Sequence, residues 1–318
     1  MPERGWAHPF PSRQRQAFDE KMKNLSRKKS KAKWALIFLI PWFIQFAVFQ
    51  AYPLFYGIYV SFTDFSFKSI SAISFVGLEN YKAIPADPAF FRSVVATIGY
   101  SAFIIPLTIV ISLWVSFLLQ GYGNRMNTFS KVLIYLPGVT CTAALVIVWK
   151  FIFMPGSGLI SGILSSLGYP MFSLFDDPMT SISTLSILIV FATLGQPVIL
   201  YSAAMNNIPT SYYEAAEIDG ASRTKQFFSI TMPLLHTTNI FVVVTTTIGI
   251  LQVFAVPYLM TGGGPQYKTS SFLLMVYKSA FQNGSFGYAS AVGIVLFIIT
   301  AIIAAIQFRL MRREAVEY

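Results

Sequence analysis

The ionisable residues whose types and spacing could do chemistry gather in one short segment of a chain that is otherwise poor in charge. Glu214, Glu217, Asp219, Arg223 and Lys225 lie between two long apolar stretches. Burying such a side chain in membrane hydrocarbon costs about 2.5 to 3.5 kcal/mol on insertion scales. We therefore expect this segment to lie in water beside a membrane, where it offers a charged surface to a soluble partner.

Residues for catalysis or metal binding are scarce. His8 and His236 are the only histidines and Cys141 is the single cysteine, so we expect no metal site and no intramolecular disulfide. The sequence contains no G-x-x-x-x-G-K-[ST] phosphate-binding loop, and the glycines of 156–162 lack the dinucleotide-binding spacing. Without converging nucleophile, base and metal ligands, we expect neither an enzyme nor a bound cofactor.

The composition predicts a polytopic membrane protein. The 318 residues are 55% hydrophobic and 11% charged, with a mean hydropathy of +0.61, whereas soluble domains are about 25% charged. A helix needs about 20 apolar residues to cross the hydrocarbon core. Six stretches are long enough, and none holds Asp, Glu, Lys or Arg away from its ends: 34–60, 94–119, 132–153, 185–205, 239–260 and 288–308.

Five of these stretches contain an internal proline, which removes a backbone hydrogen bond and favours a kink. The kinks suit a bundle that opens around a cavity, but proline is common in membrane helices generally, so both interpretations stay open. The prolines are Pro41, Pro53, Pro106, Pro137, Pro197 and Pro257. Between the last two stretches, 271–281 is apolar but too short to cross, which predicts an interfacial or re-entrant helix.

The distribution of Lys and Arg predicts that both termini are cytoplasmic. Seventeen lie on the side of the termini, ten of them in the tail 1–33, and six lie on the other side. Without the tail the difference nearly vanishes, so the orientation depends on it. The first apolar stretch is too long for a cleavable signal peptide, which favours a signal anchor, and the basic tail suits anionic lipid headgroups.

The charged segment has the local signals of a helix-turn-helix. Ser211 and Glu214 have the spacing of a capping box, which predicts a helix starting after Pro209. Ala216 and Gly220 are four residues apart and are expected to share a small face, and Gly220 can adopt a positive φ. Phe227, Ile230 and Leu234 then predict a second amphipathic helix that ends near Pro233. An ordinary amphipathic connector is the alternative.

This segment resembles the EAA loop of ABC importer permeases, and 34–308 is similar to the carbohydrate-uptake permeases of the maltose-transporter type. Such importers have a pair of permeases, and Thr261–Pro265 looks like the corresponding segment of the permease that resembles the large subunit of the maltose transporter. The resemblance implies an all-α, six-helix, type I importer (MetI-like) fold, with a tail 1–33, a permease domain 34–310 containing the loop at about 209–235, and a tail 311–318. The matching positions are Glu214, Ala215, Ala216, Asp219, Gly220, Ala221, Arg223, Phe227, Ile230 and Pro233.

In that family the loop docks into a cytoplasmic ATPase, so the resemblance implies that Glu214 pairs with a basic residue there and that ATP and Mg²⁺ are bound by the partner. It also implies a second permease subunit, an ATPase dimer, an extracytoplasmic solute-binding protein and location in the bacterial cell membrane. The alternatives are a non-sugar solute such as glycerol phosphate, an ion-coupled transporter, which would usually show intramembrane carboxylates or histidines, and a membrane scaffold.

Polar groups within the spans are the candidate solute contacts. Gln196, Tyr201, Thr246 and Gln252 offer amides and hydroxyls, which suit sugars. Leu194–Pro197 looks like the Leu-Gly-Tyr-Pro stretch that helps line the maltose site, which implies that Gly195 and Val198 also line a site. Aromatic side chains at 196 and 198 are replaced, so maltose itself is doubtful. Alternatively, the threonines bond to their own helix carbonyls and Gln196 bridges helices.

Overall fold

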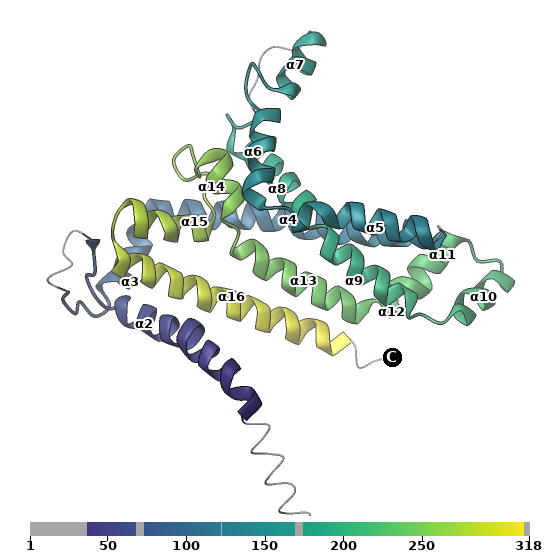
Figure 1. Ribbon diagram of the computed structural model, residues 1–318, viewed down its shortest axis with the longest axis horizontal. Coiled ribbons are helices and arrows are strands. Elements are labelled where there is room, and N and C mark those ends of the chain that lie inside the picture. Colours follow the sequence, from purple (N-terminus) through teal and green to yellow (C-terminus); the bar gives the residue numbers. More distant parts are fainter. Residues whose placement is uncertain (1–36, 68–72, 122, 169–173, 315–318) are drawn as a thin grey trace, which may run out of the picture. The chain divides into compact units, whose positions relative to one another are not determined.

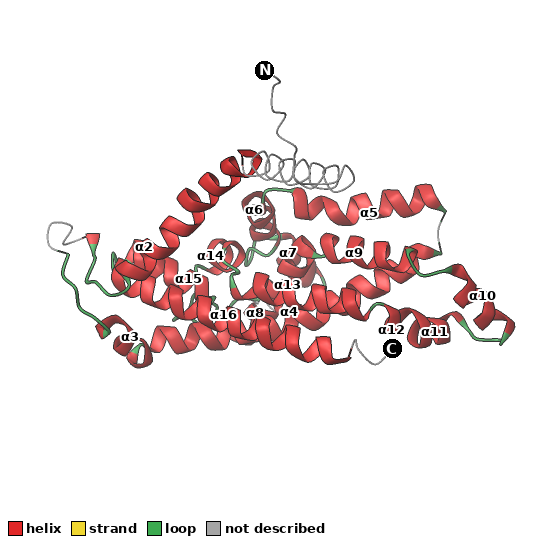
Figure 2. Cartoon of the chain, turned by 90° about the horizontal axis from the view of Figure 1, so that it is seen from below, coloured by secondary structure: helices red, strands yellow, loops and turns green. Residues whose placement is uncertain are grey.

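The computed structural model describes residues 37–67, 73–121, 123–168 and 174–314, and this part of the chain is helical, with two isolated β-bridges (Figures 1 and 2). The predicted tail 1–33 lies outside the described residues, as do residues 315–318 of the predicted tail 311–318, whose residues 311–314 continue the last helix. The helices are 37–46, η1 (Ala47–Ala51), α2 (Tyr52–Val60), α3 (Glu79–Ala83), η3 (Ile84–Ala86), α4 (Pro88–Gln120), α5 (Asn124–Val139), α6 (Thr142–Ile152), α7 (Leu159–Ser166), α8 (Pro178–Thr193), α9 (Gly195–Asn206), α10 (Thr210–Ile218), α11 (Arg223–Gln226), η4 (Phe227–Thr231), α12 (Met232–Leu234), α13 (His236–Leu251), α14 (Ala255–Thr261), α15 (Phe272–Tyr277), η5 (Lys278–Gln282) and α16 (Phe286–Glu314).

Residues 1–59 form a unit separate from residues 60–318. In the first unit, the segment from Ile37 to Tyr59 is one helix in which no residue is buried. The π-helical turn η1 directly precedes Pro53, where the missing proline N–H disturbs the regular hydrogen-bond ladder. This helix agrees with the predicted first span.

The other predicted spans fall on two continuous helices and three bent pairs. The helices Pro88–Gln120 and Phe286–Leu310 are long and apolar enough to cross a membrane, as is Ile37–Val60. The remaining three spans are possible only as pairs, Arg125–Val139 with Thr142–Ile152, Pro178–Thr193 with Gly195–Asn206, and Arg223–Leu234 with His236–Leu251, bent by 92°, 52° and 71°. The described residues therefore hold up to six spans.

The prediction of a fifth span running to residue 260 is wrong, because the helix ends at Leu251 and α14 begins at Ala255. A continuous helix would need Pro257 to donate to the carbonyl of Val253, and proline has no N–H. The Ser271 hydroxyl donates to that carbonyl instead. Pro197 follows a break in the same way, being the third residue of α9, whereas Pro106 lies within the uninterrupted α4.

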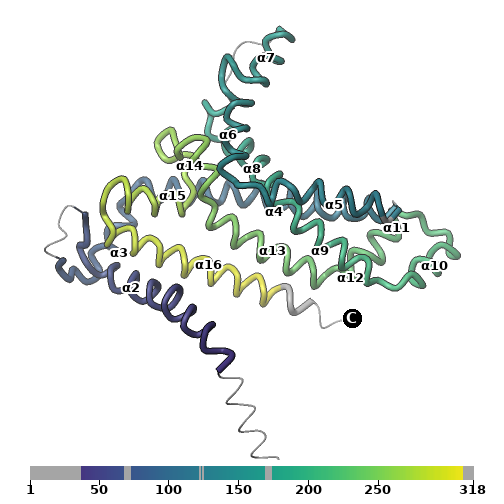
Figure 3. Tube along the Cα trace, in the orientation of Figure 1, coloured from purple at the N-terminus to yellow at the C-terminus, as the bar shows by residue number. Residues whose placement is uncertain are grey.

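Helix α4 is central to the second unit and packs against α8, α9, α13 and α15 (Figure 3). Its buried positions include Ala96, Tyr100 and Ile104, which join apolar residues of α6, α8 and α13 in one core cluster. Toward its end, Leu113 belongs to a second cluster with residues of α9 and α13. The predicted short helix within 271–281 is present as α15 and η5, and its buried Phe272 and Met275 pack with residues of α16.

Candidate functional site

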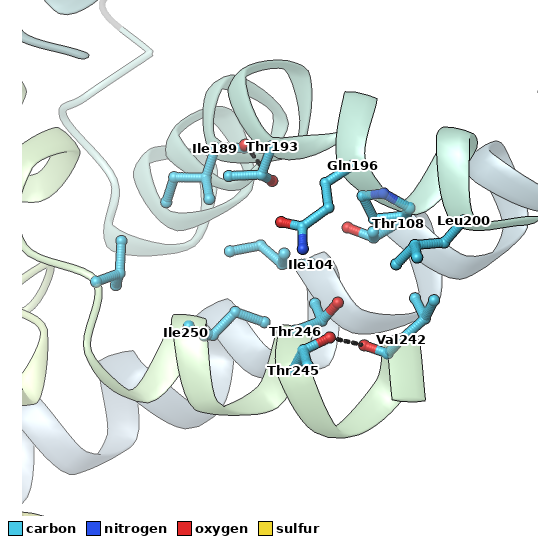
Figure 4. A pocket seen from close by; sticks show the side chains of 13 residues that line it. Ile104, Thr108, Ile189, Thr193, Gln196, Leu200, Val242, Thr245, Thr246 and Ile250 are labelled. Atoms are coloured by element: carbon cyan, nitrogen blue, oxygen red, sulfur yellow. Dashed lines mark hydrogen bonds between the residues drawn. The ribbon is translucent and has the colours of Figure 1, made fainter. Parts of the chain in front are cut away.

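A cavity of about 230 Å³ lies among α4, α8, α9 and α13 (Figure 4). The cavity lies beside the break between α8 and α9, and Thr193 at the end of α8 and Gln196 at the start of α9 both line it. No charged residue lines it. The lining residues are Ile104, Thr108, Ile189, Thr193, Gln196, Pro197, Leu200, Val242, Thr245, Thr246, Gly249, Ile250 and Val253.

Three polar groups in this lining have no hydrogen-bond partner among the described residues. Thr108 is only 1% exposed, and its buried hydroxyl has no hydrogen-bond partner. The Gln196 side chain extends from α9 into the space between α9 and α13, and Thr246 reaches the same space from α13 (Figure 4). A buried hydroxyl without a partner costs about 1 to 3 kcal/mol. The cavity lining therefore contains an amide and two hydroxyls, of which the Thr108 hydroxyl is itself buried.

The other threonines near the cavity are satisfied by their own helices. Thr193 Oγ1 donates to the Ile189 carbonyl at 2.8 Å and Thr245 Oγ1 to the Phe241 carbonyl at 2.7 Å. Thr247 Oγ1 donates to the Val243 carbonyl at 2.8 Å and accepts from Gln307 Nε2 at 2.9 Å. The alternative of back-bonded threonines in the fifth span is thus confirmed for Thr245 and Thr247 but not for Thr246, and Thr193 on α8 is bonded in the same way.

Three residues expected to line a solute site are packed elsewhere. Gly195 lies against α5, where an added Cβ would be 2.6 Å from Tyr135 Cα, so this position requires glycine for helix packing. Val198 and Tyr201 are both fully buried outside the cavity lining. The structure therefore gives Gly195 a packing role and separates these three residues from Gln196, which still faces the cavity.

Gln252 lies in a different hollow, because it follows the last turn of α13 on the side that faces α16. This second hollow measures about 290 Å³ and is lined by residues of α13 and α16, including Gly293 and Thr300. The structure therefore does not bring Gln252 together with Gln196 and Thr246.

The sequence interpretation overlooked Thr108, which contributes the most deeply buried free hydroxyl of the cavity. Helix α4 carries several hydroxyls, and most are bonded: Thr97 Oγ1 to the Ser93 carbonyl at 2.7 Å and Ser116 Oγ to the Val198 carbonyl at 2.9 Å. No pattern in the sequence separates Thr108 from these neighbours. Its distinction comes from the cavity, which only the packing of α4 on α9 and α13 creates.

The segment resembling the EAA loop folds into a helical elbow, residues 210–234. As predicted, α10 begins after Pro209, but the predicted capping box is wrong: no side chain caps this helix, and Ser211 lies inside its first turn. Gly220 has a φ of 72°. It also lies beyond the end of α10, so the prediction that it shares a helical face with Ala216 is wrong.

Gly220 ends α10 with a Schellman motif. The Ala221 N–H donates to the Ala216 carbonyl at 2.9 Å and the Gly220 N–H donates to the Glu217 carbonyl at 3.0 Å. The chain then turns, and the Ser222 hydroxyl caps the next helix by accepting from the Lys225 N–H at 3.4 Å. These local bonds fix the angle between α10 and α11.

Phe227 anchors the second arm of the elbow to the helical bundle. The arm runs from Arg223 to Leu234, as predicted, with Ile230 half-buried and Pro233 exposed within it. Phe227 is 3% exposed, and its ring centroid lies 4.7 Å from that of Phe117 and 5.5 Å from that of Trp114 on α4. The Tyr213 and Thr231 hydroxyls are 2.8 Å apart and join the two arms.

The outer face of the elbow is exposed and acidic. Glu214, Ala215, Asp219 and Arg223 are exposed, while Ala216 and Ala221 are half-buried. Within the described part of the chain, Glu214 makes no ion pair or hydrogen bond that would occupy its carboxylate. Beside it, Ile218 is 88% exposed, a high value for an isoleucine. An acidic helix with an exposed aliphatic side chain is suited to binding a protein surface that offers a cation and an apolar pocket.

Comparison with known proteins places these features in a family. Residues 34–316 match the family model described as the binding-protein-dependent transport system inner membrane component. The MsmF permease of the multiple sugar-binding transport system of Streptococcus mutans is 28% identical over 90% of this chain and 98% of its own. The UgpA permease of the sn-glycerol-3-phosphate transport system of Brucella abortus is 30% identical over 87% and 94%.

A solved structure has the same fold. It is a bacterial alginate ABC transporter in complex with an alginate pentasaccharide-bound periplasmic protein, and one of its chains matches with a TM-score of 0.78. The two chains are 21% identical, and the match covers 90% of this chain and 96% of the other. The predicted all-α importer permease fold is thus confirmed.

Proposed function

Since the chain belongs to the family of binding-protein-dependent transport system inner membrane components, we propose that it forms half of the translocation pathway of an ATP-driven importer for a sugar or oligosaccharide. Its relatives include the permease of a multiple sugar-binding transport system. The observation that carries the proposal is the cavity with three uncommitted polar groups, Thr108, Gln196 and Thr246. Sugar hydroxyls both donate and accept hydrogen bonds, as these groups do.

The main alternative solute is glycerol phosphate, which the name of the relative UgpA suggests. A phosphate buried in a membrane protein needs a cation or several N–H donors. The cavity lining contains no Lys, Arg or His. A neutral polyhydroxylated solute therefore suits this cavity better than a phosphate ester.

Transport by the reconstituted importer tests the cavity. We expect Thr108→Val, Gln196→Leu and Thr246→Val each to weaken the apparent affinity for solute by about 5- to 30-fold, because each removes a hydrogen-bonding group from the cavity lining. Thr245→Val is the matched control, since its hydroxyl is bonded within α13. Unchanged apparent affinity in all three variants would contradict the proposed cavity. So would a loss of affinity in the control Thr245→Val as large as in the three variants.

We further propose that the elbow docks onto a cytoplasmic ATPase dimer, that a second permease completes the pathway, and that an extracytoplasmic binding protein delivers the solute. On this proposal the chain has no cofactor of its own, because ATP and Mg²⁺ are bound by the ATPase, and both termini are cytoplasmic. The free Glu214 carboxylate and the exposed Ile218 support the docking role.

Variants of the elbow test the coupling. We expect Glu214→Ala or Gly220→Asp to abolish ATP-driven uptake while membrane insertion is retained. Removing Glu214 from an ion pair in a dry joint with the ATPase would cost about 3 to 5 kcal/mol, and an aspartate at residue 220 would be strained at the positive φ that ends α10. Glu79→Ala, which removes an exposed carboxylate from α3, is the control. Normal transport by both elbow variants would exclude docking through this surface.

The proposed orientation is tested separately. In a Cys141→Ala background, a cysteine introduced at Ser222 is expected to react with a membrane-impermeant maleimide only in inside-out vesicles. Reaction in intact cells would place the elbow outside and refute the coupling proposal.

A further inference from the structure

An apolar groove with two cations lies where α4 and α8 begin, away from both features described above. Its volume is about 460 Å³ and its lining comprises Phe91, Arg92, Val95, Pro178, Met179, Ile182 and Lys268. Phe91, Val95 and Met179 are 53%, 66% and 59% exposed, so large apolar side chains face outward along it. The groove thus combines an apolar floor with a cationic end.

Both cations are held in place by the loop between α14 and α15. Arg92 Nη1 donates to the Gln266 carbonyl at 3.1 Å, which fixes the guanidinium and leaves its other N–H groups available. Tyr100 Oη donates to the Thr269 carbonyl at 2.8 Å, so the residue that follows Lys268 is bonded to α4. Two attachments to one helix therefore keep Lys268 beside Arg92.

No acidic side chain is among the residues that line the groove. Neither Arg92 nor Lys268 has an ion-pair partner in the described ranges. The carboxylates that cap α4 and α8 accept hydrogen bonds from other groups rather than from these cations: Asp87 accepts from the Ala89 N–H and the Tyr288 hydroxyl, and Asp177 accepts from the Met179 and Thr180 N–H groups. An anion is therefore the complementary ligand.

We propose that this groove binds an anionic phospholipid, with the phosphate between Arg92 and Lys268 and an acyl chain along Phe91, Val95 and Met179. Helix α4 begins at Pro88 and its predicted apolar span begins at residue 94, so we expect Phe91, Arg92 and Val95 to lie near the level of the headgroups. Arginine and lysine side chains donate charge-assisted hydrogen bonds to phosphate oxygens, so the two cations suit a phosphate headgroup. A soluble anion would have no use for the apolar floor.

Lipid retention by the purified full-length chain tests the proposal. Mass spectrometry of retained lipids, followed by titration with phosphatidylglycerol after delipidation, is expected to show affinity about 5-fold weaker in Lys268→Gln and about 30-fold weaker in Arg92→Gln/Lys268→Gln, at about one headgroup interaction per cation. Lys82→Gln, which removes an exposed lysine from α3, is expected to behave as wild type. Lys268 takes no part in the hydrogen bond between Arg92 and Gln266, so weaker lipid binding in Lys268→Gln would reflect the lost charge and not a displaced loop.

Two further arms identify the ligand. Val95→Trp fills the groove without changing its charge, so it is expected to displace phosphatidylglycerol. Phosphatidylcholine and inorganic phosphate are expected not to substitute for it. The proposal would be overturned if phosphatidylcholine bound as tightly as phosphatidylglycerol, or if inorganic phosphate displaced phosphatidylglycerol from the groove. Full retention of lipid in Val95→Trp and Lys268→Gln would also overturn it. So would a co-purifying partner permease that shields Lys268 from amine labelling in delipidated protein.

Discussion

Removing the Phe227 ring is the sharpest test of how the elbow is attached to the bundle. The side chain is 3% exposed and packs on Phe117 and Trp114 of α4 and on the buried cluster that includes Tyr201 and Leu235. Phe→Ala at such a site costs about 3 to 5 kcal/mol. That corresponds to a shift of roughly 150-fold or more toward states in which the elbow is unseated.

We therefore expect Phe227→Ala to reduce solute uptake per ATP hydrolysed to less than about a tenth of the wild-type ratio, since an unseated elbow cannot transmit motion to α4 and α13. The assay is uptake and ATP hydrolysis measured together in proteoliposomes containing the assembled importer. Phe228→Ala is the control, because that neighbouring ring is 53% exposed and its removal costs within about 1 kcal/mol. Equal ratios for Phe227→Ala and wild type would refute the view that this ring joins elbow and bundle.

Two other substitutions test the cavity and its support. Gly249→Phe is expected to block uptake while the protein still inserts and folds, because nothing lies within 4 Å of an added Cβ there and the new ring would enter the cavity; a variant with normal uptake and an unchanged melting temperature would contradict this. Gly195→Ala is expected to destabilise the chain by about 1 to 3 kcal/mol, because its methyl group would lie 2.6 Å from Tyr135 Cα. Its thermal unfolding can be compared with that of Gly123→Ala, where no atom lies within 4 Å of an added Cβ.

The elements that the sequence predicts well are those with strong, local signals. Long apolar runs reveal α4 and α16, and the elbow follows from a small set of charged and small residues around Gly220. The start of α10 agrees with the prediction, but the predicted cap does not form. The Ser211 and Glu214 pair suggests a capping box, whereas the helix begins directly after Pro209, whose backbone is extended, and no side chain caps it.

What the sequence does not predict depends on contacts between distant segments. Breaks in the helices do not follow from prolines alone, since Pro106 leaves α4 unbroken whereas Pro257 follows the break between α13 and α14, where the free Val253 carbonyl is bonded by Ser271. Gln252 and Gln196 look equivalent as polar residues in apolar spans, but they face different hollows. Thr108 gains its distinction only from the packing of three helices around it.

The elbow is attached to the bundle mainly through its inner surface, at Phe227 and at the Tyr213 and Thr231 hydroxyls. Its outward face, with Glu214 and Ile218, takes no part in those attachments. Selection can therefore preserve that face while the lining of the cavity diverges. On the proposed coupling role, a change in the cavity lining would alter which solute passes without altering the surface offered to the ATPase.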